Sequence, residues 1–137
     1  MKIKALYLFL SLLTVLTLTN CKKDASADVT LFGKWKVEGY VASSSSLAQT
    51  SATDIYLTFN NNKTIDISLE ANECSGSFTI EASAITILDV GCTEICCDSD
   101  FSLELMDLIQ LVESHHFTND QLNLTGPDFL NIRLNKE

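Results

Sequence analysis

A period-two alternation of apolar and polar residues, which runs through most of the chain from Leu31 onward, most limits the folds open to this sequence. Successive side chains of a β-strand point to opposite faces, so this alternation predicts strands with one buried face. It is clearest over residues 55–69, where two alternating runs flank Asn60-Asn61-Asn62-Lys63. Asparagine tolerates the positive φ of tight turns. We therefore predict a hairpin here.

Shorter runs of the same kind predict strands along the rest of the chain. The serine-rich stretch 42–53 between the first two runs is predicted to be a loop. The other predicted strands contain Trp35, Val37 and Val41; Phe78 and Ile80; Ile85, Ile87 and residues 88–90; residues 114–118; Leu122 and Leu124; and Leu130, Ile132 and Leu134.

The period changes once, near Asp98. There the apolar residues take the spacing of a helix, which predicts one amphipathic helix at about 99–113 with Asp98 or Ser99 as its N-cap. The apolar stripe consists of Phe101, Leu105, Leu108, Ile109 and Val112.

These elements predict a mostly β (α+β) fold. Short connections favour a curled antiparallel β-sheet or a small barrel of about eight strands. The helix is inserted between strands five and six, where we expect it to cover one opening.

The N-terminus predicts export. Lys2 and Lys4 precede a fourteen-residue apolar run, 5–18, which is too short for a helix that spans a membrane and is typical of a signal peptide. Leu18-Thr19-Asn20-Cys21 resembles a lipobox, although Gly, Ala or Ser is usual where Asn20 stands. The alternative is an ordinary secretory signal that happens to contain a cysteine.

The lipobox resemblance implies a bacterial lipoprotein cleaved before Cys21 and acylated on that residue. Several acyl chains hold a protein stably on a membrane. The predicted organisation is a signal peptide at 1–20, a lipidated flexible tether at 21–30 and one domain at 31–137. The predicted location is the cell envelope, anchored to the outer membrane on its periplasmic face or at the cell surface.

The net negative charge of the chain limits the kinds of partner that it can bind. The formal charge of the chain is −9, and loss of Lys2 and Lys4 with the signal peptide makes it −11. Such an acidic protein is not suited to bind nucleic acid or to bind anionic lipid electrostatically. The membrane is therefore expected as a partner only through the lipid anchor. A protein or small-molecule partner cannot be named from the sequence.

Four further cysteines, Cys74, Cys92, Cys96 and Cys97, predict two disulfide bonds in an exported domain. Adjacent Cα atoms are about 3.8 Å apart across a trans peptide, shorter than a disulfide usually requires. We therefore expect Cys74 to pair with Cys96 or Cys97, and Cys92 with the other. A thiolate metal site is the alternative, but the Cys-x₂-Cys spacing of structural zinc sites is absent. No metal or cofactor is predicted.

The order of elements and several short motifs resemble the META/HslJ-like domain family. Leu31-Phe32-Gly33-Lys34-Trp35-Lys36-Val37 is similar to its "L-x-G-x-W-x-V" opening, and Asn72–Phe78 to "N-x-x-S-G-x-Y". Gly91–Cys96 stands where the family has a Thr-x-x-Cys turn, and Leu122-Asn123-Leu124 matches its closing "L-x-L". The family's Gly-Cys-Asn cysteine is displaced here to Cys74. The resemblance implies a small β-rich domain with one helix and no established catalytic activity.

A second resemblance stays open. Gly33-Lys34-Trp35 is also similar to the Gly-x-Trp start of lipocalin-like carriers of apolar ligands. The domain is short for eight long strands around a cavity.

No catalytic residue is predicted. His115 and His116 are neighbours on a strand and should face opposite sides. Ser43–Ser46 has no histidine and acid arranged nearby. We interpret the following carboxylates as solvated charge: Asp66, Glu70, Glu73, Glu81, Asp89 and Glu94. The sequence thus predicts a non-enzymatic protein with a binding or envelope-maintenance role.

Overall fold

The computed structural model describes residues 30–43 and 46–137. The predicted signal peptide, Cys21 and the predicted tether as far as residue 29 lie outside them. Within these ranges the elements are β1 (Gly33–Val41), β2 (Gln49–Thr50), β3 (Tyr56–Phe59), β4 (Thr64–Ser68), β5 (Glu73–Glu81), β6 (Ala84–Cys92), α2 (Asp100–Ile109), β7 (Ser114–Thr118), β8 (Gln121–Thr125), the 3₁₀ turn η1 (Pro127–Phe129) and β9 (Asn131–Lys136).

The nine strands form one antiparallel sheet that closes into a ring. Neighbours in the ring follow chain order from β3 to β9, and β9 pairs back onto β1. Strand β1 pairs with β3 through its first half and with the short β2 near its end. The connections from β3 to β6 and from β7 to β9 are short, whereas the segment between β6 and β7 contains α2.

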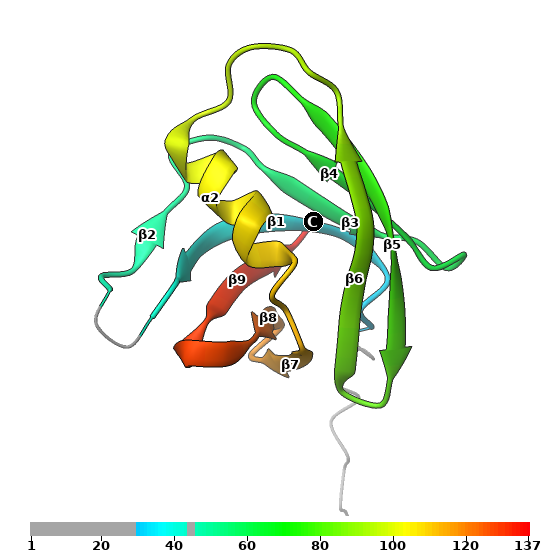
Figure 1. Ribbon diagram of the computed structural model, residues 1–137. Coiled ribbons are helices and arrows are strands. Elements are labelled where there is room, and N and C mark those ends of the chain that lie inside the picture. The colour runs from blue at the N-terminus through cyan, green and yellow to red at the C-terminus, as the bar shows by residue number, and fades with distance from the viewer. Residues whose placement is uncertain (1–29, 44–45) are drawn as a thin grey trace, which may run out of the picture.

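Pairing between neighbouring strands of the ring is sparse between β6 and β7. These strands share one residue pair, Ala84 with Ser114, before they diverge. Figure 1 shows α2 in front of the ring, in the space flanked by β6 and β1. The helix buries Leu105, Leu108 and Ile109. It therefore packs onto the hydrophobic core that the ring encloses.

The mostly β fold with one helix is confirmed, but two details of the prediction are wrong. The described residues form nine strands, because β2 lies inside the serine-rich stretch that we predicted to be a loop. The helix lies at the predicted place in the chain, and it follows the sixth strand only because β2 is counted. It ends at Ile109, and Val112 is buried just beyond it in the connection to β7.

The interior of the ring is filled with side chains. Trp35 is completely buried, and its indole N–H donates to the carbonyl of Leu31 at 2.7 Å. A pocket of about 240 Å³ lies at the β5–β6 turn, below the ~300–1,000 Å³ range of small-molecule sites. The interior of the ring is thus occupied by the buried side chains of the core. The largest fully buried side chains are Trp35, Tyr40, Phe59, Phe78, Ile55, Leu57, Ile65, Ile67, Ile85, Leu105, Ile109 and Leu122.

A bulge in β1 changes which residues face inward. The register with β9 shifts between Val37 and Gly39. An extra residue at a bulge moves the following side chains to the other face. As a result Tyr40 is buried, whereas Val41, which simple alternation places inward, is only half-buried.

The predicted hairpin over residues 55–69 is confirmed by the β3–β4 register. Its turn has positive φ at Lys63 (67°) rather than at one of the asparagines. The β7–β8 turn has positive φ at both Asn119 and Asp120, as a two-residue hairpin turn requires.

We predict that Gly33→Ala destabilises the fold by about 2 kcal/mol, because a side chain is strained at positive φ. Gly33 has φ 116°, and an added Cβ would lie 2.6 Å from Lys136 Nζ. Gly91→Ala is the matched control, since a Cβ there meets nothing within 4 Å. Urea unfolding should show a loss for the first variant only. Equal stability of the two variants would contradict this explanation of the Gly-x-Trp motif.

Candidate functional site

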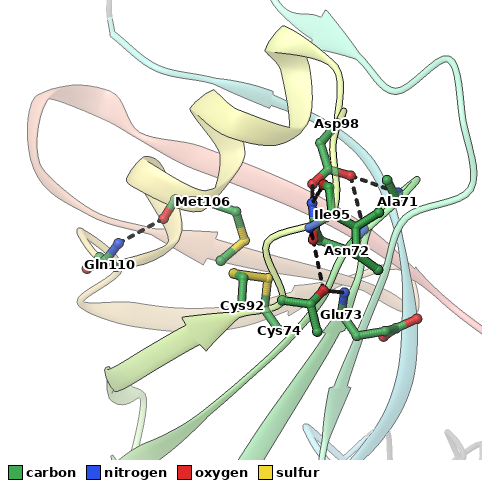
Figure 2. Close-up of a disulfide and its surroundings, with 10 residues drawn as sticks. Ala71, Asn72, Glu73, Cys74, Cys92, Ile95, Asp98, Met106 and Gln110 are labelled. Atoms are coloured by element: carbon green, nitrogen blue, oxygen red, sulfur yellow. Dashed lines mark hydrogen bonds between the residues drawn. A yellow bond between two sulfur atoms is a disulfide. The ribbon is translucent and has the colours of Figure 1, made fainter.

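Asn72, just before β5, fastens the loop that leads from β6 to α2. Its amide Nδ2 donates to the carbonyl of Ile95 at 2.6 Å and to Asp98 Oδ2 at 2.6 Å. Its Oδ1 accepts from Thr93 Oγ1 at 2.8 Å and from the backbone N–H of Ile95 at 2.7 Å. Asn72 is buried. We call Asn72, Thr93, Ile95 and Asp98 the Asn72 cluster (Figure 2).

Asp98 completes this cluster and does not cap the helix. Its Oδ1 accepts from the backbone N–H groups of Ala71 (2.8 Å) and Asn72 (3.3 Å). The N-cap is Ser99, whose hydroxyl accepts from the backbone N–H of Ser102 at 3.2 Å. Of the two caps considered from the sequence, Ser99 is therefore the one used.

The carboxylate of Glu70 accepts hydrogen bonds from hydroxyl groups on two segments of the chain. Its carboxylate accepts from Thr53 (2.8 Å), Ser99 (2.7 Å) and Ser102 (2.5 Å). Burial alone would raise the pKa of Glu70, but the hydrogen bonds from Ser102, Ser99 and Thr53 outweigh it and lower this pKa to about 2. We interpreted Glu70 from the sequence as solvated charge, yet it joins the start of α2 to the sheet.

Protonation of Glu70 should therefore weaken the fold. The ordinary pKa of 4.5 falls to about 2 in the folded state, so the ionised form stabilises the fold above about pH 4.5, and this contribution is lost as the pH falls toward 2. We expect Glu70→Gln to make the loss of thermal stability between pH 5 and pH 2 shallower. The control is Glu81→Gln, at an exposed turn. An unchanged acid profile for Glu70→Gln would contradict this role.

Tyr40 binds the middle of the helix. Its hydroxyl donates to Glu104 Oε2 at 2.7 Å, and its ring lies 4.8 Å from that of Phe101. Burial, followed by the hydrogen bond and charge of Glu104, raises the pKa of Tyr40. Because of the bulge in β1, the side chain of Tyr40 lies where it can donate a hydrogen bond to Glu104 of α2.

The Cys74–Cys92 disulfide crosslinks β5 and β6 below the Asn72 cluster. The two residues are directly opposite in the register, with Cα atoms 4.0 Å apart. A register shift between Ser75 and Ser77 brings them opposite. Figure 2 shows the side chain of Met106 in α2 pointing toward this bridge.

The predicted pairing of the cysteines is wrong. We expected Cys74 to bond to Cys96 or Cys97, but its partner is Cys92, and Cys96 and Cys97 pair with each other. The vicinal bridge that we disfavoured forms across a cis peptide bond. The physical reason for the error is the bulged β5–β6 register, which takes Cys92 as the partner of Cys74 and leaves the adjacent pair together.

The remaining candidates do not assemble into a reactive site among the described residues. His115 is half-buried, with Nδ1 3.0 Å from the carbonyl of Ser83, and burial lowers its pKa; His116 is exposed. Asp66 and Glu73 accept from Asn60 and Ser68. Glu81, Asp89 and Glu94 are exposed. Of the serine run, Ser43 and Ser46 bond to each other, and residues 44–45 lie outside the description.

No group of three or more His, Cys, Asp or Glu residues in the described ranges is placed to hold a metal ion. Nor does any helix in these ranges have the length and apolar character needed to cross a membrane.

The comparisons with solved structures concern the fold. A protein from Burkholderia xenovorans, solved by NMR, has TM-score 0.64 at 12% identity, over 77% of this chain and 81% of that one. A DUF4847 family protein from Bacteroides vulgatus has TM-score 0.59 at 10% identity, over 77% and 92%. At such low identity these likenesses show a shared fold alone. None of the curated proteins matches the chain.

The META domain family matches residues 28–134. This range contains the strands from β1 to β8, most of β9, the Asn72 cluster and both disulfides. It also covers the motifs from Leu31 to Leu124 that resembled the family in the sequence. The chain therefore belongs to the META domain family.

Proposed function

We propose that this protein is a lipid-anchored, non-enzymatic META domain of the bacterial cell envelope, with a binding or envelope-maintenance role. The observation that carries the proposal is the sequence Leu18-Thr19-Asn20-Cys21 after a short apolar run. Its acylated cysteine would tether the folded domain to the outer membrane, on the periplasmic face or at the cell surface.

The state of the other cysteines supports export. All four are bridged, and disulfides persist in oxidising compartments but are rare in the cytosol. A small domain also gains much from such a crosslink, because a bridge typically contributes about 2–4 kcal/mol.

The arrangement of polar groups supports a non-enzymatic role. The best-connected carboxylates, Glu70 and Asp98, accept hydrogen bonds that hold a loop and a helix in place. Their partners are hydroxyl, amide and backbone groups rather than a histidine or cysteine nucleophile. A binding role needs only a presented surface, and the loop between β6 and α2 is such a surface.

The experiment compares Cys21→Ser with the wild type in a bacterium that processes lipoproteins, fed an alkyne fatty acid. We expect the wild type to be acylated and membrane-bound, and the variant to carry no acyl chain and to leave the membrane fraction. Cys97→Ser is the control for loss of a cysteine and should stay acylated. If Cys21→Ser were processed and fractionated like the wild type, the lipid anchor would be refuted.

A further inference from the structure

The two disulfides differ in what they hold together. Cys74–Cys92 spans a sequence separation of 18 and joins two paired strands; Cys74 is only 3% exposed, whereas Cys92 is exposed. Cys96–Cys97 has a separation of 1, and both residues are exposed. A bridge between adjacent residues closes no long loop, so it barely restricts the unfolded chain. Folding therefore stabilises the Cys74–Cys92 bridge against reduction, whereas it does not stabilise the Cys96–Cys97 bridge in this way.

The exposed pair lies on a loop that is fixed on both sides. Thr93 and Ile95 before it, and Asp98 after it, are all bonded to Asn72. Opening the Cys96–Cys97 bond breaks none of these hydrogen bonds. The hydrogen bonds to Asn72 therefore hold the loop on both sides of the pair without involving its sulfur atoms.

The charge around this loop selects the kind of partner. No lysine or arginine occurs between Lys63 and Arg133. The loop and the first turn of α2 carry Glu94, Asp98 and Asp100, and Glu70 bonds to Ser99 at the end of the loop. Negative charge repels an anionic thiolate and attracts a reagent that carries positive charge beside its thiol.

We propose that Cys96 and Cys97 form a thiol–disulfide exchange site for a dithiol reductant with positive charge beside its reactive thiol. The thiolate of the reductant attacks one Sγ atom, and the Cys96–Cys97 bond breaks. The other sulfur leaves with the electron pair and takes a proton from water. The second thiol of the reductant then loses its proton and attacks the mixed disulfide. The reductant leaves as a disulfide, and both cysteines are reduced.

The first test asks whether the two bridges open separately; it does not depend on the lipid anchor. The processed protein is equilibrated in dithiothreitol redox buffers, alkylated and mapped by mass spectrometry. We expect Cys96 and Cys97 to be labelled together while Cys74 and Cys92 remain bridged, with no change in Trp35 fluorescence. Opening of Cys74–Cys92 under equal or milder conditions would overturn the proposal.

The second test asks whether charge selects the partner. Reduction rates are measured with cysteamine, which is cationic, and mercaptopropionate, which is anionic. Each rate is divided by the rate of the same thiol with a small uncharged disulfide, because the two thiolates differ in intrinsic nucleophilicity. We expect the normalised rate to be about fivefold higher for cysteamine in ~10 mM salt and the ratio of normalised rates to approach one in ~1 M salt. Glu94→Gln, which lies outside the Asn72 cluster, should reduce the ratio. Equal normalised rates at low salt, or a higher normalised rate for the anionic thiol, would refute the cationic partner.

Discussion

Replacement of Asn72 by alanine is expected to lower the free energy of unfolding by about 3 kcal/mol, because its loss leaves buried partners unpaired. The side chain makes four hydrogen bonds to the β6–α2 loop, including both backbone groups of Ile95. Urea denaturation measures the effect. Asn61→Ala, in the exposed β3–β4 turn, is the control and should change stability by less than about 0.5 kcal/mol.

An isosteric variant separates hydrogen bonding from packing. Asn72→Asp places a carboxylate where Nδ2 lies 2.6 Å from Asp98 Oδ2, so we expect a loss at least as large as that of alanine. Adding Asp98→Asn to this variant restores a donor between the two positions and should recover part of the loss. A double variant no more stable than Asn72→Asp would show that this contact does not hold the loop.

Trp35→Ala is expected to cost about 4 kcal/mol, because it removes the largest side chain of the core and leaves a cavity. Trp35 is completely buried on β1, the strand that pairs with β3 on one side and β9 on the other. It contacts the ring of Phe117 at 5.9 Å, and Lys136 Nζ lies 4.4 Å from the Trp35 ring. Circular dichroism follows unfolding after the tryptophan is lost.

The matched control for the core variant is Leu47→Ala. Leu47 is 83% exposed, so truncating it removes little buried surface and should leave stability almost unchanged. A Trp35→Ala protein as stable as Leu47→Ala would mean that the ring is not packed around Trp35.

The sequence predicted the strands well where alternation was unbroken. Residues 55–69 form the expected hairpin, and the strands expected at 114–118 and at Leu122 and Leu124 pair with each other, because one buried face and a short turn determine their register. The prediction from alternation failed at the two bulges. One extra residue in β1 puts Tyr40 inside, and another shift between β5 and β6 sets Cys74 opposite Cys92. A periodic pattern carries no signal for such an insertion, so both the inward residue and the disulfide partner were missed.

The candidate site was predicted only in outline. Asn72 and Thr93 belonged to motifs that resembled the family, and the structure shows that they bond to each other. Asp98 was considered as a cap, and Glu70 as solvated charge, because local sequence does not show which distant groups a loop brings near. Glu70 and Ser102 are 32 residues apart and meet only when α2 packs onto the sheet.

The most direct test of the account is the disulfide map of the native protein, purified without reductant. Trypsin cannot resolve it, since no basic residue separates the four cysteines. Cleavage after glutamate gives the separate peptides 74–81, 82–94 and 95–104. We expect peptide 74–81 to be linked to 82–94, and Cys96 to be bonded to Cys97 within 95–104. A link from Cys74 to 95–104, or four free thiols, would contradict it.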